Sequence, residues 1–231
     1  MKCGVVTFPG SNCDEDMRYA LADLLGADVV SLWHKDQDLQ GAEMLVLPGG
    51  FSYGDHLRAG AIARFSPIME EVIAHAKKGG PVLGICNGFQ ILCEAGLLPG
   101  TLMVNQNRLF VCRNTYIRVD SKETYLTSEL EEGDVLQVPV AHKEGRYFAS
   151  EATLDALEKE DRVLFRYSDQ TGKTEESVDP NGSFRKIAGI CNPERNVIGM
   201  MPHPERATDP LLGNSDGASL LRPLVKEGIK A

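Results

Sequence analysis

Hydrophobic and polar positions alternate in long blocks over the first hundred residues of the chain. Continuous apolar runs, which are typical of fully buried strands, span residues 2–8, 27–33, 44–50 and 81–86. Segments with helical spacing separate them, over 12–25, over 62–78 and from 87 onward. The first of these opens with Asn12 and Glu15 at the spacing of a capping box. Buried strands that alternate with helices predict a parallel sheet covered by helices on both faces.

The second half of the chain alternates over shorter distances. Short strands divided by polar turns are predicted over 108–120, 134–142, 162–169, 186–192 and 196–202, with one short helix near 153–161. The acidic segment 171–185 is expected to be a surface loop, and residues 215–228 a closing helix. No internal repeat or linker interrupts this pattern. It predicts one α/β domain over 1–231, with a mostly parallel central sheet flanked by helices and an additional smaller β-rich part.

Composition and charge narrow the class of protein. The 231 residues include 42% hydrophobic and 25% charged residues, the balance of a soluble globular protein. The formal net charge is -9 and no basic run exceeds Lys77–Lys78, which argues against binding to nucleic acid or to an anionic membrane. The first residues lack the apolar core of a signal peptide, and no run approaches the ~18 apolar residues of a membrane span. We therefore expect an unprocessed cytoplasmic protein.

The cysteines include one candidate nucleophile. Six occur without a CxxC pair or zinc-finger spacing, so a packed free thiol is the expected state of each, and no metal site is expected. Cys86 differs because it ends an apolar run, directly precedes a helix and lies between Gly84 and Gly88. This is the spacing of the G-x-S-x-G nucleophile elbow with sulfur in place of the hydroxyl. A helix N-terminus favours the thiolate, and the Asn87 N–H would face an oxyanion; an ordinary strand-to-helix turn is the alternative.

A thiolate that expels an amine needs an acid, and histidine is the usual one. Of the five histidines, His75 falls in the last turn of a helix, and His34 and His56 fall in polar segments that we expect to be exposed. His142 and His203 each follow an apolar strand. Ligands bind beyond the carboxyl ends of the strands in parallel sheets, so both remain candidates.

The surroundings of His203 add a second catalytic group. Pro202 and Pro204 restrict the backbone on either side and hold His203 extended. Side chains alternate in an extended segment, so Glu205 is expected on the same side, where its carboxylate would orient the imidazole. Gly49 and Gly50 end the run 44–50 and leave N–H groups open for a second oxyanion donor, although a plain turn would read the same way.

These motifs together resemble a known family. GICNGFQ, MPHPE and the PGG loop are similar to those of the class I glutamine amidotransferases, which have a Cys-His-Glu triad. PGSNCDED, PGGFSYGDHLRAGAIA, PVAHKEGRY and GMMPHPER resemble, more closely, the glutaminase subunits of phosphoribosylformylglycinamidine synthase. The resemblance spans about residues 3–221 and implies the flavodoxin-like fold of the class I glutamine amidotransferases.

The resemblance also implies roles for particular residues. Cys86 would be the nucleophile, His203 the acid and base, and Glu205 its orienting carboxylate. The other implied residues are Gly50 and Asn87 for the oxyanion hole, Gly50, Gln90 and His142 for binding glutamine, and Asp55, His56, Arg58 and Arg146 for a partner interface. Lys143 departs from the small residues frequent at its position, which puts the detail of that loop in doubt.

The implied reaction is hydrolysis of L-glutamine to glutamate and ammonia through a cysteine thioester. The ammonia would pass to a synthetase subunit that converts formylglycinamide ribonucleotide to formylglycinamidine ribonucleotide in purine biosynthesis, and a small third subunit usually bridges the two. Neither G-x-x-x-x-G-K-[ST] nor G-x-G-x-x-G occurs, so ATP and Mg are assigned to the synthetase and no cofactor to this chain. The alternatives are a free-standing cysteine hydrolase, such as a peptidase or γ-glutamyl hydrolase, and a non-enzymatic scaffold. FSYGDHLRAGAIA argues against the first, and the complete Cys-His-Glu set argues against the second.

Overall fold

One nine-stranded sheet runs through the whole molecule. A computed structural model describes residues 1–226, with the side chain of Glu176 left out. The strand order is β2-β1-β3-β4-β11-β10-β9-β6-β7. The first five strands in this order are mutually parallel: β2 (Asp28–Trp33), β1 (Lys2–Thr7), β3 (Met44–Leu47), β4 (Val82–Ile85) and β11 (Val197–Met200). Nearly all residues of β1, β3, β4 and β11 are buried, and the pairing confirms the parallel sheet expected from the apolar runs.

The other half of the sheet is antiparallel. It consists of β10 (Ile187–Cys191), β9 (Val163–Ser168), β6 (Val111–Val119) and β7 (Val135–His142). A separate two-stranded sheet pairs β5 (Thr101–Met103) with β8 (Arg146–Phe148). The β-rich part expected from the sequence is therefore mainly a continuation of the central sheet. The assignment of residues 1–231 to a single domain stays a prediction.

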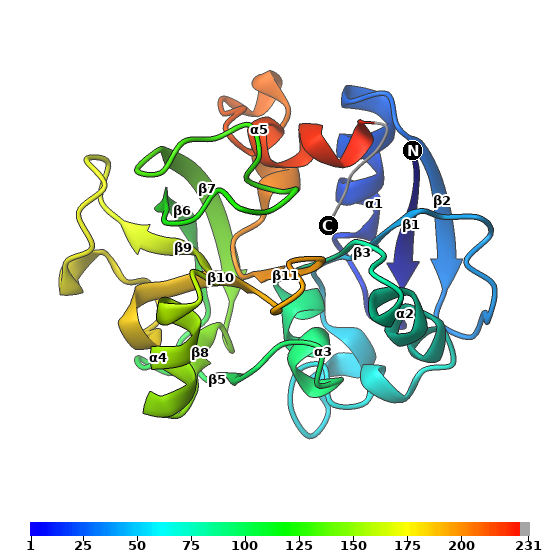
Figure 1. Ribbon diagram of the computed structural model, residues 1–231, viewed down its shortest axis with the longest axis horizontal. Helices are drawn as coiled ribbons and strands as arrows, with labels where there is room; N and C mark the ends of the chain where they lie inside the picture. Colours follow the sequence, from blue (N-terminus) through cyan, green and yellow to red (C-terminus); the bar gives the residue numbers. More distant parts are fainter. Residues whose placement is uncertain (227–231) are drawn as a thin grey trace.

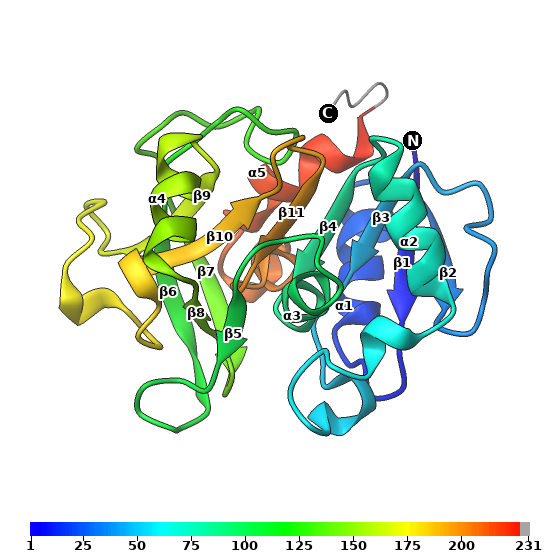
Figure 2. The same ribbon diagram turned by 60° about the horizontal axis from the view of Figure 1, so that its bottom comes forward.

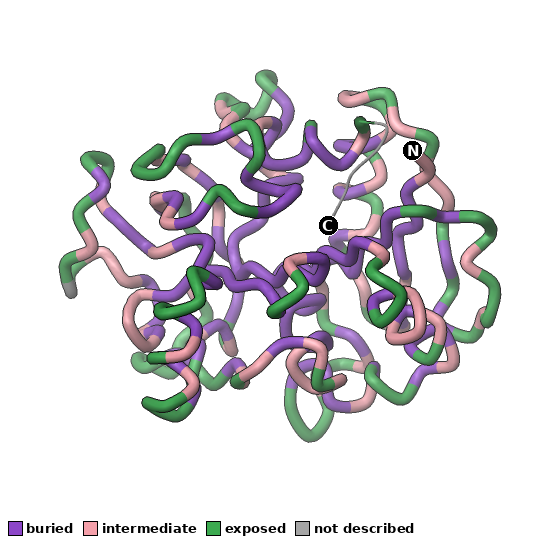
Figure 3. The backbone as a smooth tube through the Cα atoms, in the orientation of Figure 1, coloured by how far each residue is buried: buried purple, intermediate pink, exposed green. Residues whose placement is uncertain are grey.

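Helices cover both faces of the sheet. The α-helices are α1 (Asp14–Arg18), continued by a π-helix over Tyr19–Leu24, α2 (Ile68–Lys77), α3 (Asn87–Glu94), α4 (Glu151–Lys159) and α5 (Gly217–Leu221). Short 3-10 turns span Ser52–Asp55, Ala63–Phe65, Glu176–Val178, Phe184–Lys186, Pro204–Ala207, Pro210–Leu212 and Arg222–Val225. Figures 1 and 2 show α2, α3 and α4 on one face and α1 and α5 on the other. The buried stretches of the tube follow the sheet between these layers (Figure 3).

Three local expectations need correction. The helix after Asn12 begins at Asp14 without a side-chain cap, because the Asn12 Oδ1 atom instead accepts a hydrogen bond from the Cys13 thiol at 3.2 Å. His34 is 5% exposed, not at the surface, because its Nδ1 atom lies 2.7 Å from the Tyr53 hydroxyl under the loop after β3. The closing helix starts at Gly217 and becomes a 3-10 turn, and its expected last residues, 227 and 228, lie outside the described residues.

The acidic segment 171–185 is only partly a surface loop. Asn181 and Ser183 are buried, and Asn181 Nδ2 donates to the Gly145 carbonyl oxygen at 2.9 Å. This segment therefore supports the loop between β7 and β8, although its composition suggested only exposure to solvent.

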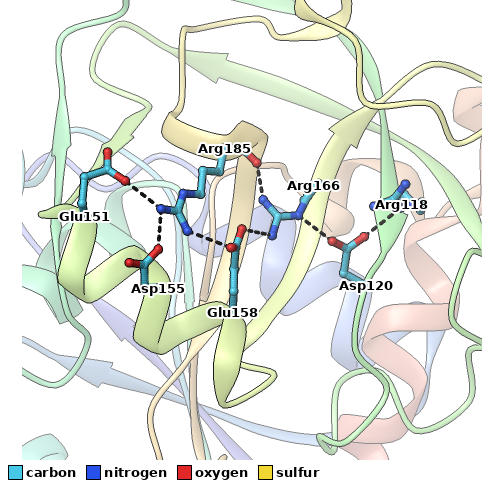
Figure 4. A network of polar contacts seen from close by, with 7 residues as sticks. All are labelled: Arg118, Asp120, Glu151, Asp155, Glu158, Arg166 and Arg185. Atoms are coloured by element: carbon cyan, nitrogen blue, oxygen red, sulfur yellow. Dashed lines mark hydrogen bonds and ion pairs between the residues drawn. The ribbon is translucent and has the colours of Figure 1, made fainter.

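An arginine network fastens α4 to the antiparallel half of the sheet (Figure 4). Arg166 on β9 donates to Asp120 Oδ2 at 2.6 Å and to Glu158 Oε1 at 2.8 Å. Arg185 donates to Glu158 Oε2 and Glu151 Oε2, each at 2.7 Å. Because the Arg166 side chain is only 15% exposed, water screens its ion pairs less than it screens surface pairs. Among residues 1–226, no helix has the length and apolarity that a membrane crossing requires.

Candidate active site

Sheet order brings the predicted catalytic segments to one edge. Strands β3, β4 and β11 are parallel neighbours, with Leu47 paired to Gly84 and Met200 paired to Ile85. Their carboxyl ends therefore coincide, and each is followed at once by a segment singled out in the sequence: Gly49–Gly50, Cys86 and His203. The Cys86 N–H donates to the Met200 carbonyl oxygen at 2.8 Å, which ties the two central loops together.

Cys86 has the backbone conformation of a nucleophile elbow. Its φ of 48° and ψ of -102° lie in a region that L-residues rarely adopt. The flanking glycines permit the turn by close packing: a Cβ on Gly88 would lie 1.9 Å from the Leu47 carbonyl oxygen, and one on Gly84 would lie 2.7 Å from the Gly88 backbone. An ordinary strand-to-helix turn, the alternative interpretation of the sequence, does not require these strained backbone angles at the cysteine.

His203 and Glu205 form a buried pair. Nδ1 of His203 lies 2.6 Å from Oε1 of Glu205, and the two side chains are 1% and 0% exposed. The sequence analysis predicted that His203 and Glu205 lie on the same side of an extended backbone. The extended backbone is wrong for Glu205, because this residue lies in the 3-10 turn Pro204–Ala207. The turn still places the carboxylate beside the ring. The His203 N–H donates to the Pro139 carbonyl oxygen at 2.8 Å, so β7 also fixes the position of this loop.

The environment of His203 favours the imidazolium. Burial by itself would lower the pKa of His203, but the Glu205 carboxylate and then the Cys86 thiol raise this pKa well above its usual range. With Nδ1 engaged by Glu205, the buried Nε2 has no hydrogen-bond partner among residues 1–226. This nitrogen is thus available to exchange a proton with a thiol or with a substrate.

Cys13 is a neighbour of this pair that sequence reasoning missed. Its Sγ, a nitrogen of His203 and an oxygen of Glu205 all lie within 4.8 Å of one another. These atoms could in principle ligate a metal ion, but the Arg206 guanidinium donates to the same sulfur at 3.2 Å, and its positive charge opposes a second cation there. The only sequence signal for Cys13 was its place in PGSNCDED.

A cavity of about 250 Å³ opens beside the thiol. Its lining residues are Gly50, Phe51, Asp55, Cys86, Gln90, Phe110, Ala141, His142, Lys143 and Glu144. The N–H of Asn87, the first residue of α3, has no intrahelical acceptor, and the Gly50 N–H donates to no backbone carbonyl among the described residues. Among residues 1–226, neither donor predicted for the oxyanion hole has an assigned backbone acceptor, and both residues adjoin Cys86 or its cavity.

Gln90 and His142 contribute to the cavity in different ways. Gln90 Nε2 donates to the Glu144 carbonyl oxygen at 2.5 Å, and its Oε1 accepts from Asn87 Nδ2 at 2.9 Å. The His142 ring lies between Asn105 Oδ1 at 3.2 Å and Asn181 Nδ2 at 3.4 Å, and burial lowers its pKa to about 4. His142 is thus a neutral support for its loop, and its ring nitrogens already face protein groups.

The four residues predicted for a partner interface separate in the structure. His56 and Arg58 are exposed, and Arg58 forms a two-pronged ion pair with Glu94, with both distances 2.6 Å. Arg146 Nε donates to the Gly182 carbonyl oxygen at 3.0 Å. Asp55, in contrast, lines the cavity that contains Cys86.

Comparison with known proteins shows the family to which this chain belongs. The family model of the CobB/CobQ-like glutamine amidotransferase domain matches residues 1–218. The phosphoribosylformylglycinamidine synthase subunit PurQ of Chlorobium luteolum is 54% identical over 224 residues, 97% of each chain. That of Moorella thermoacetica is 55% identical over 225 residues, 97% of this chain and 95% of the relative. Among solved structures, PurLQS from Thermotoga maritima matches with a TM-score of 0.85 at 38% identity, over 96% of both chains.

Proposed function

Since this chain belongs to the CobB/CobQ-like glutamine amidotransferases and, within them, to the glutaminase subunits of phosphoribosylformylglycinamidine synthase, we propose that Cys86, His203 and Glu205 carry out its glutaminase reaction. One observation carries the assignment. A strained cysteine at the end of β4 and a buried His–Glu pair after β11 meet at adjacent ends of parallel strands.

The first half of the reaction forms a thioester. His203 Nε2 takes the thiol proton, and the Cys86 sulfur attacks the side-chain amide carbon of L-glutamine. The Gly50 and Asn87 N–H groups stabilise the oxyanion. As this intermediate collapses, His203 gives its proton to the amide nitrogen, which leaves as ammonia. Glu205 keeps Nε2 directed at the reacting atoms and stabilises the imidazolium.

The second half regenerates the thiol. Water, deprotonated by His203, attacks the γ-glutamyl thioester carbon, glutamate departs and the proton returns to sulfur. Gln90 holds the Glu144 backbone at the cavity wall. Gln90 and the backbone at Gly50 and His142 bind the substrate in this proposal.

The chain acts with a synthetase subunit, and apolar side chains near the cavity suit such a partner. Phe51 and Phe110 line the cavity that contains Cys86, and their ring centroids lie 6.4 Å apart. A groove of about 780 Å³, which shares Glu144 with the cavity, presents the exposed side chains of Leu57, Met103, Val104 and Phe148. Exposed apolar patches of this kind mark protein interfaces. His56, Arg58 and Arg146 belong to this interface in our proposal, and a small third subunit bridges the two larger ones.

The sequence contains neither G-x-x-x-x-G-K-[ST] nor G-x-G-x-x-G. In this proposal the synthetase uses ATP and Mg, and this chain takes no cofactor. The reaction sequence that consumes the ammonia takes place in the cytoplasm.

Glutamate release from glutamine tests the proposal. It is measured for the chain alone and with the synthetase subunits, ATP and formylglycinamide ribonucleotide. We expect strong stimulation by the partners and its complete loss in Cys86→Ala. Cys112→Ala removes an exposed cysteine on β6 and is the matched control. Activity that survives in Cys86→Ala excludes the proposed nucleophile, and activity indifferent to the partners favours the free-standing hydrolase.

A further inference from the structure

Cys13 lies beside the His203–Glu205 pair but outside the substrate cavity. It is 2% exposed and immediately precedes α1, and it does not belong to the described lining of the cavity that contains Cys86. Its Sγ lies within 4.8 Å of both a nitrogen of His203 and an oxygen of Glu205. The glutaminase reaction does not use this thiol as a reactant, although it lies beside the residue that carries the proton.

The Cys13 thiol both donates and accepts a hydrogen bond, and the two bonds together fix its orientation. Its S–H donates to Asn12 Oδ1 at 3.2 Å, and its sulfur accepts from Arg206 Nη2, also at 3.2 Å. Burial raises the pKa of Cys13, so the group is a protonated thiol at neutral pH, as the bond to Asn12 requires. The sulfur therefore cannot turn away from its place without breaking one of these bonds.

Arg206 connects the turn that carries Glu205 to α1. It directly follows Glu205 in the 3-10 turn Pro204–Ala207, and its Nε donates to Asp16 Oδ2 at 2.9 Å. The same guanidinium thus binds a carboxylate on α1 and the Cys13 sulfur. Because the guanidinium is planar and its donors have fixed directions, the two bonds hold α1 and the catalytic turn at a set distance.

The segment that carries Cys13 is braced against the loop after β3. The Phe51 N–H donates to the Gly10 carbonyl oxygen at 3.0 Å, and Ser11 forms an isolated bridge with Gly50. A Cβ on Gly10 would lie 2.3 Å from the Phe51 carbonyl oxygen, so the two loops are in direct backbone contact. This contact gives Cys13 a rigid support.

Gly49 allows the thiol and the imidazole to pack together. A Cβ on Gly49 would lie 3.0 Å from Cys13 Sγ and 2.6 Å from His203 Cε1. A larger residue at this position would push the sulfur and the ring apart. The His203 ring is therefore confined by the Glu205 carboxylate at Nδ1, by the backbone of Gly49 and by the Cys13 sulfur.

The His203–Glu205 pair needs this confinement. Glu205 Oε2 and His203 Nε2 are both buried and have no hydrogen-bond partner among residues 1–226. The bond between Nδ1 and Oε1 leaves the ring free to tilt about the axis of that bond, and a tilt would carry Nε2 away from the reacting atoms. Close packing of Cys13 beside the ring removes this freedom.

We propose that Cys13, held by Arg206, is a positioning residue that keeps the His203 imidazole directed at the reacting atoms. The inference rests on the proposed glutaminase function and gives the segment PGSNCDED a part in it. Cys13 forms no bond to the substrate and remains a thiol throughout. Its contribution lies in the proton-transfer steps and not in the affinity for glutamine.

The test measures kcat and KM for glutamate release in the assembled complex, with ATP and formylglycinamide ribonucleotide present. We expect Cys13→Ala to lower kcat about 10-fold and to leave KM within about 2-fold, because a misdirected proton-transfer group affects the transition state more than it affects binding. Cys13→Ser keeps a donor and an acceptor at the same position and should recover most of kcat. Arg206→Gln, which breaks the ion pair with Asp16, should lower kcat about as much as Cys13→Ala.

The pH dependence of kcat/KM separates positioning from a general loss of stability. The titratable and charged groups around His203 and its turn are Glu205, Cys86, Cys13, Arg206, Asp16 and His142. Burial lowers the pKa of His203, but the Glu205 carboxylate and then the Cys86 and Cys13 thiols raise it. Cys13→Ala should therefore move the alkaline limb of the profile to lower pH. Arg206→Gln removes a cation and should move the same limb to higher pH.

Cys191→Ala is the matched control. Cys191 is a fully buried cysteine on β10, and it pairs with Ile198 near the start of β11, whereas His203 follows the end of that strand. This variant should lower stability and leave kcat and the pH profile of the folded enzyme unchanged. Circular dichroism melts show whether each variant folds, and Arg206→Gln, at a partly exposed position, tests the same contact if Cys13→Ala does not fold.

Three results would overturn the proposal. The first is an unchanged kcat and pH profile in a folded Cys13→Ala or Arg206→Gln enzyme. The second is a rise in KM with unchanged kcat, which would make Cys13 part of substrate binding. The third is a loss of kcat with no shift of the alkaline limb in either variant, because such a loss indicates a general defect of the site. If Cys86→Ala retains activity, the proposed function itself fails, and that outcome is distinct from these three.

Discussion

Nδ1 of His203 and Oε1 of Glu205 lie 2.6 Å apart in a region that is closed to solvent. The two residues lie two positions apart in sequence, and β7 and α5 pack against the 3-10 turn Pro204–Ala207 that carries Glu205. A buried charge pair is costly to disrupt, since removal of one partner leaves the other uncompensated. The chemistry and the stability of this site are therefore linked through one contact.

Glu205→Gln should abolish a dependence of stability on pH. In the folded protein the pKa of His203 is raised above 6.5, so its protonated form stabilises the fold fully below pH 6.5. This contribution is lost as pH rises through the raised pKa, with a slope of up to about 1.4 kcal/mol per pH unit. Without the carboxylate, burial dominates and the decline above pH 6.5 should vanish.

Urea unfolding between pH 6.5 and 9 measures this slope. Glu132→Gln, at an exposed position, is the control and should keep the slope of the unmodified protein. In Glu205→Gln the glutaminase kcat should also fall roughly 10²- to 10⁴-fold, the usual contribution of an acid–base group. An unchanged slope in Glu205→Gln would show that the pair does not hold the proton.

His142 should produce the opposite dependence at lower pH. Its folded-state pKa is about 4, below the ordinary 6.5, so the unfolded chain binds the extra proton first. Stability is then lost as pH falls from 6.5 toward 4, again by up to about 1.4 kcal/mol per pH unit. His142→Gln, measured by urea unfolding over that range, should flatten the loss. His56→Gln is exposed and should not.

Gly88→Ala should disrupt the elbow. The added methyl group would meet the Leu47 carbonyl oxygen at 1.9 Å, and backbone cannot move aside as a flexible side chain can. We expect a loss of about 3 kcal/mol in unfolding free energy, together with loss of glutaminase activity. Gly213→Ala, where the space is open and only the positive φ of 83° is unfavourable, should cost about 1 kcal/mol and retain activity. A stable, active Gly88→Ala enzyme is incompatible with the packing described for α3 against β3.

Arg166→Ala should affect stability without affecting catalysis. Its largely buried guanidinium bridges Asp120 and Glu158 and joins α4 to the sheet, away from the cavity. We expect a loss of about 2 kcal/mol in chemical denaturation, with glutamine turnover of the remaining folded enzyme unchanged. Lys122→Ala breaks an ion pair with Glu131 that is exposed on both sides and should have no measurable effect.

Glutamine should protect Cys86 selectively from thiol labelling. Iodoacetamide at pH 7.5 followed by peptide mass mapping is expected to modify Cys86 and the exposed Cys112 before the other cysteines. Burial raises the pKa of Cys3 and of Cys191 to about 11, so their thiolates are scarce at this pH. Glutamine should protect Cys86 and leave Cys112 unprotected. Equal protection of both cysteines, or of neither, would contradict the location of the substrate beside Cys86.

The sequence by itself determined the features that depend on neighbouring residues. An apolar run followed by Gly84, Cys86 and Gly88 predicted the elbow, because strand, turn and helix signals all lie within a few positions there. The alternation of buried strands and helices predicted the parallel sheet for the same reason. His203 and Glu205 were also found locally, although a 3-10 turn, not an extended backbone, brings them together.

Only the tertiary structure decided which distant segments meet. The order β1-β3-β4-β11 places the loops that follow these strands at one edge, brings Cys13 beside His203 and places Asp55 in the lining of the cavity of Cys86. The same packing buries His34 and turns Asn181 toward the loop after β7, although both lie in polar segments. Hydrophobic periodicity specifies which face of an element is buried, but it does not specify the neighbour against which that face packs. Contacts between polar side chains from separate elements follow from strand order and register, which the folded chain fixes as a whole.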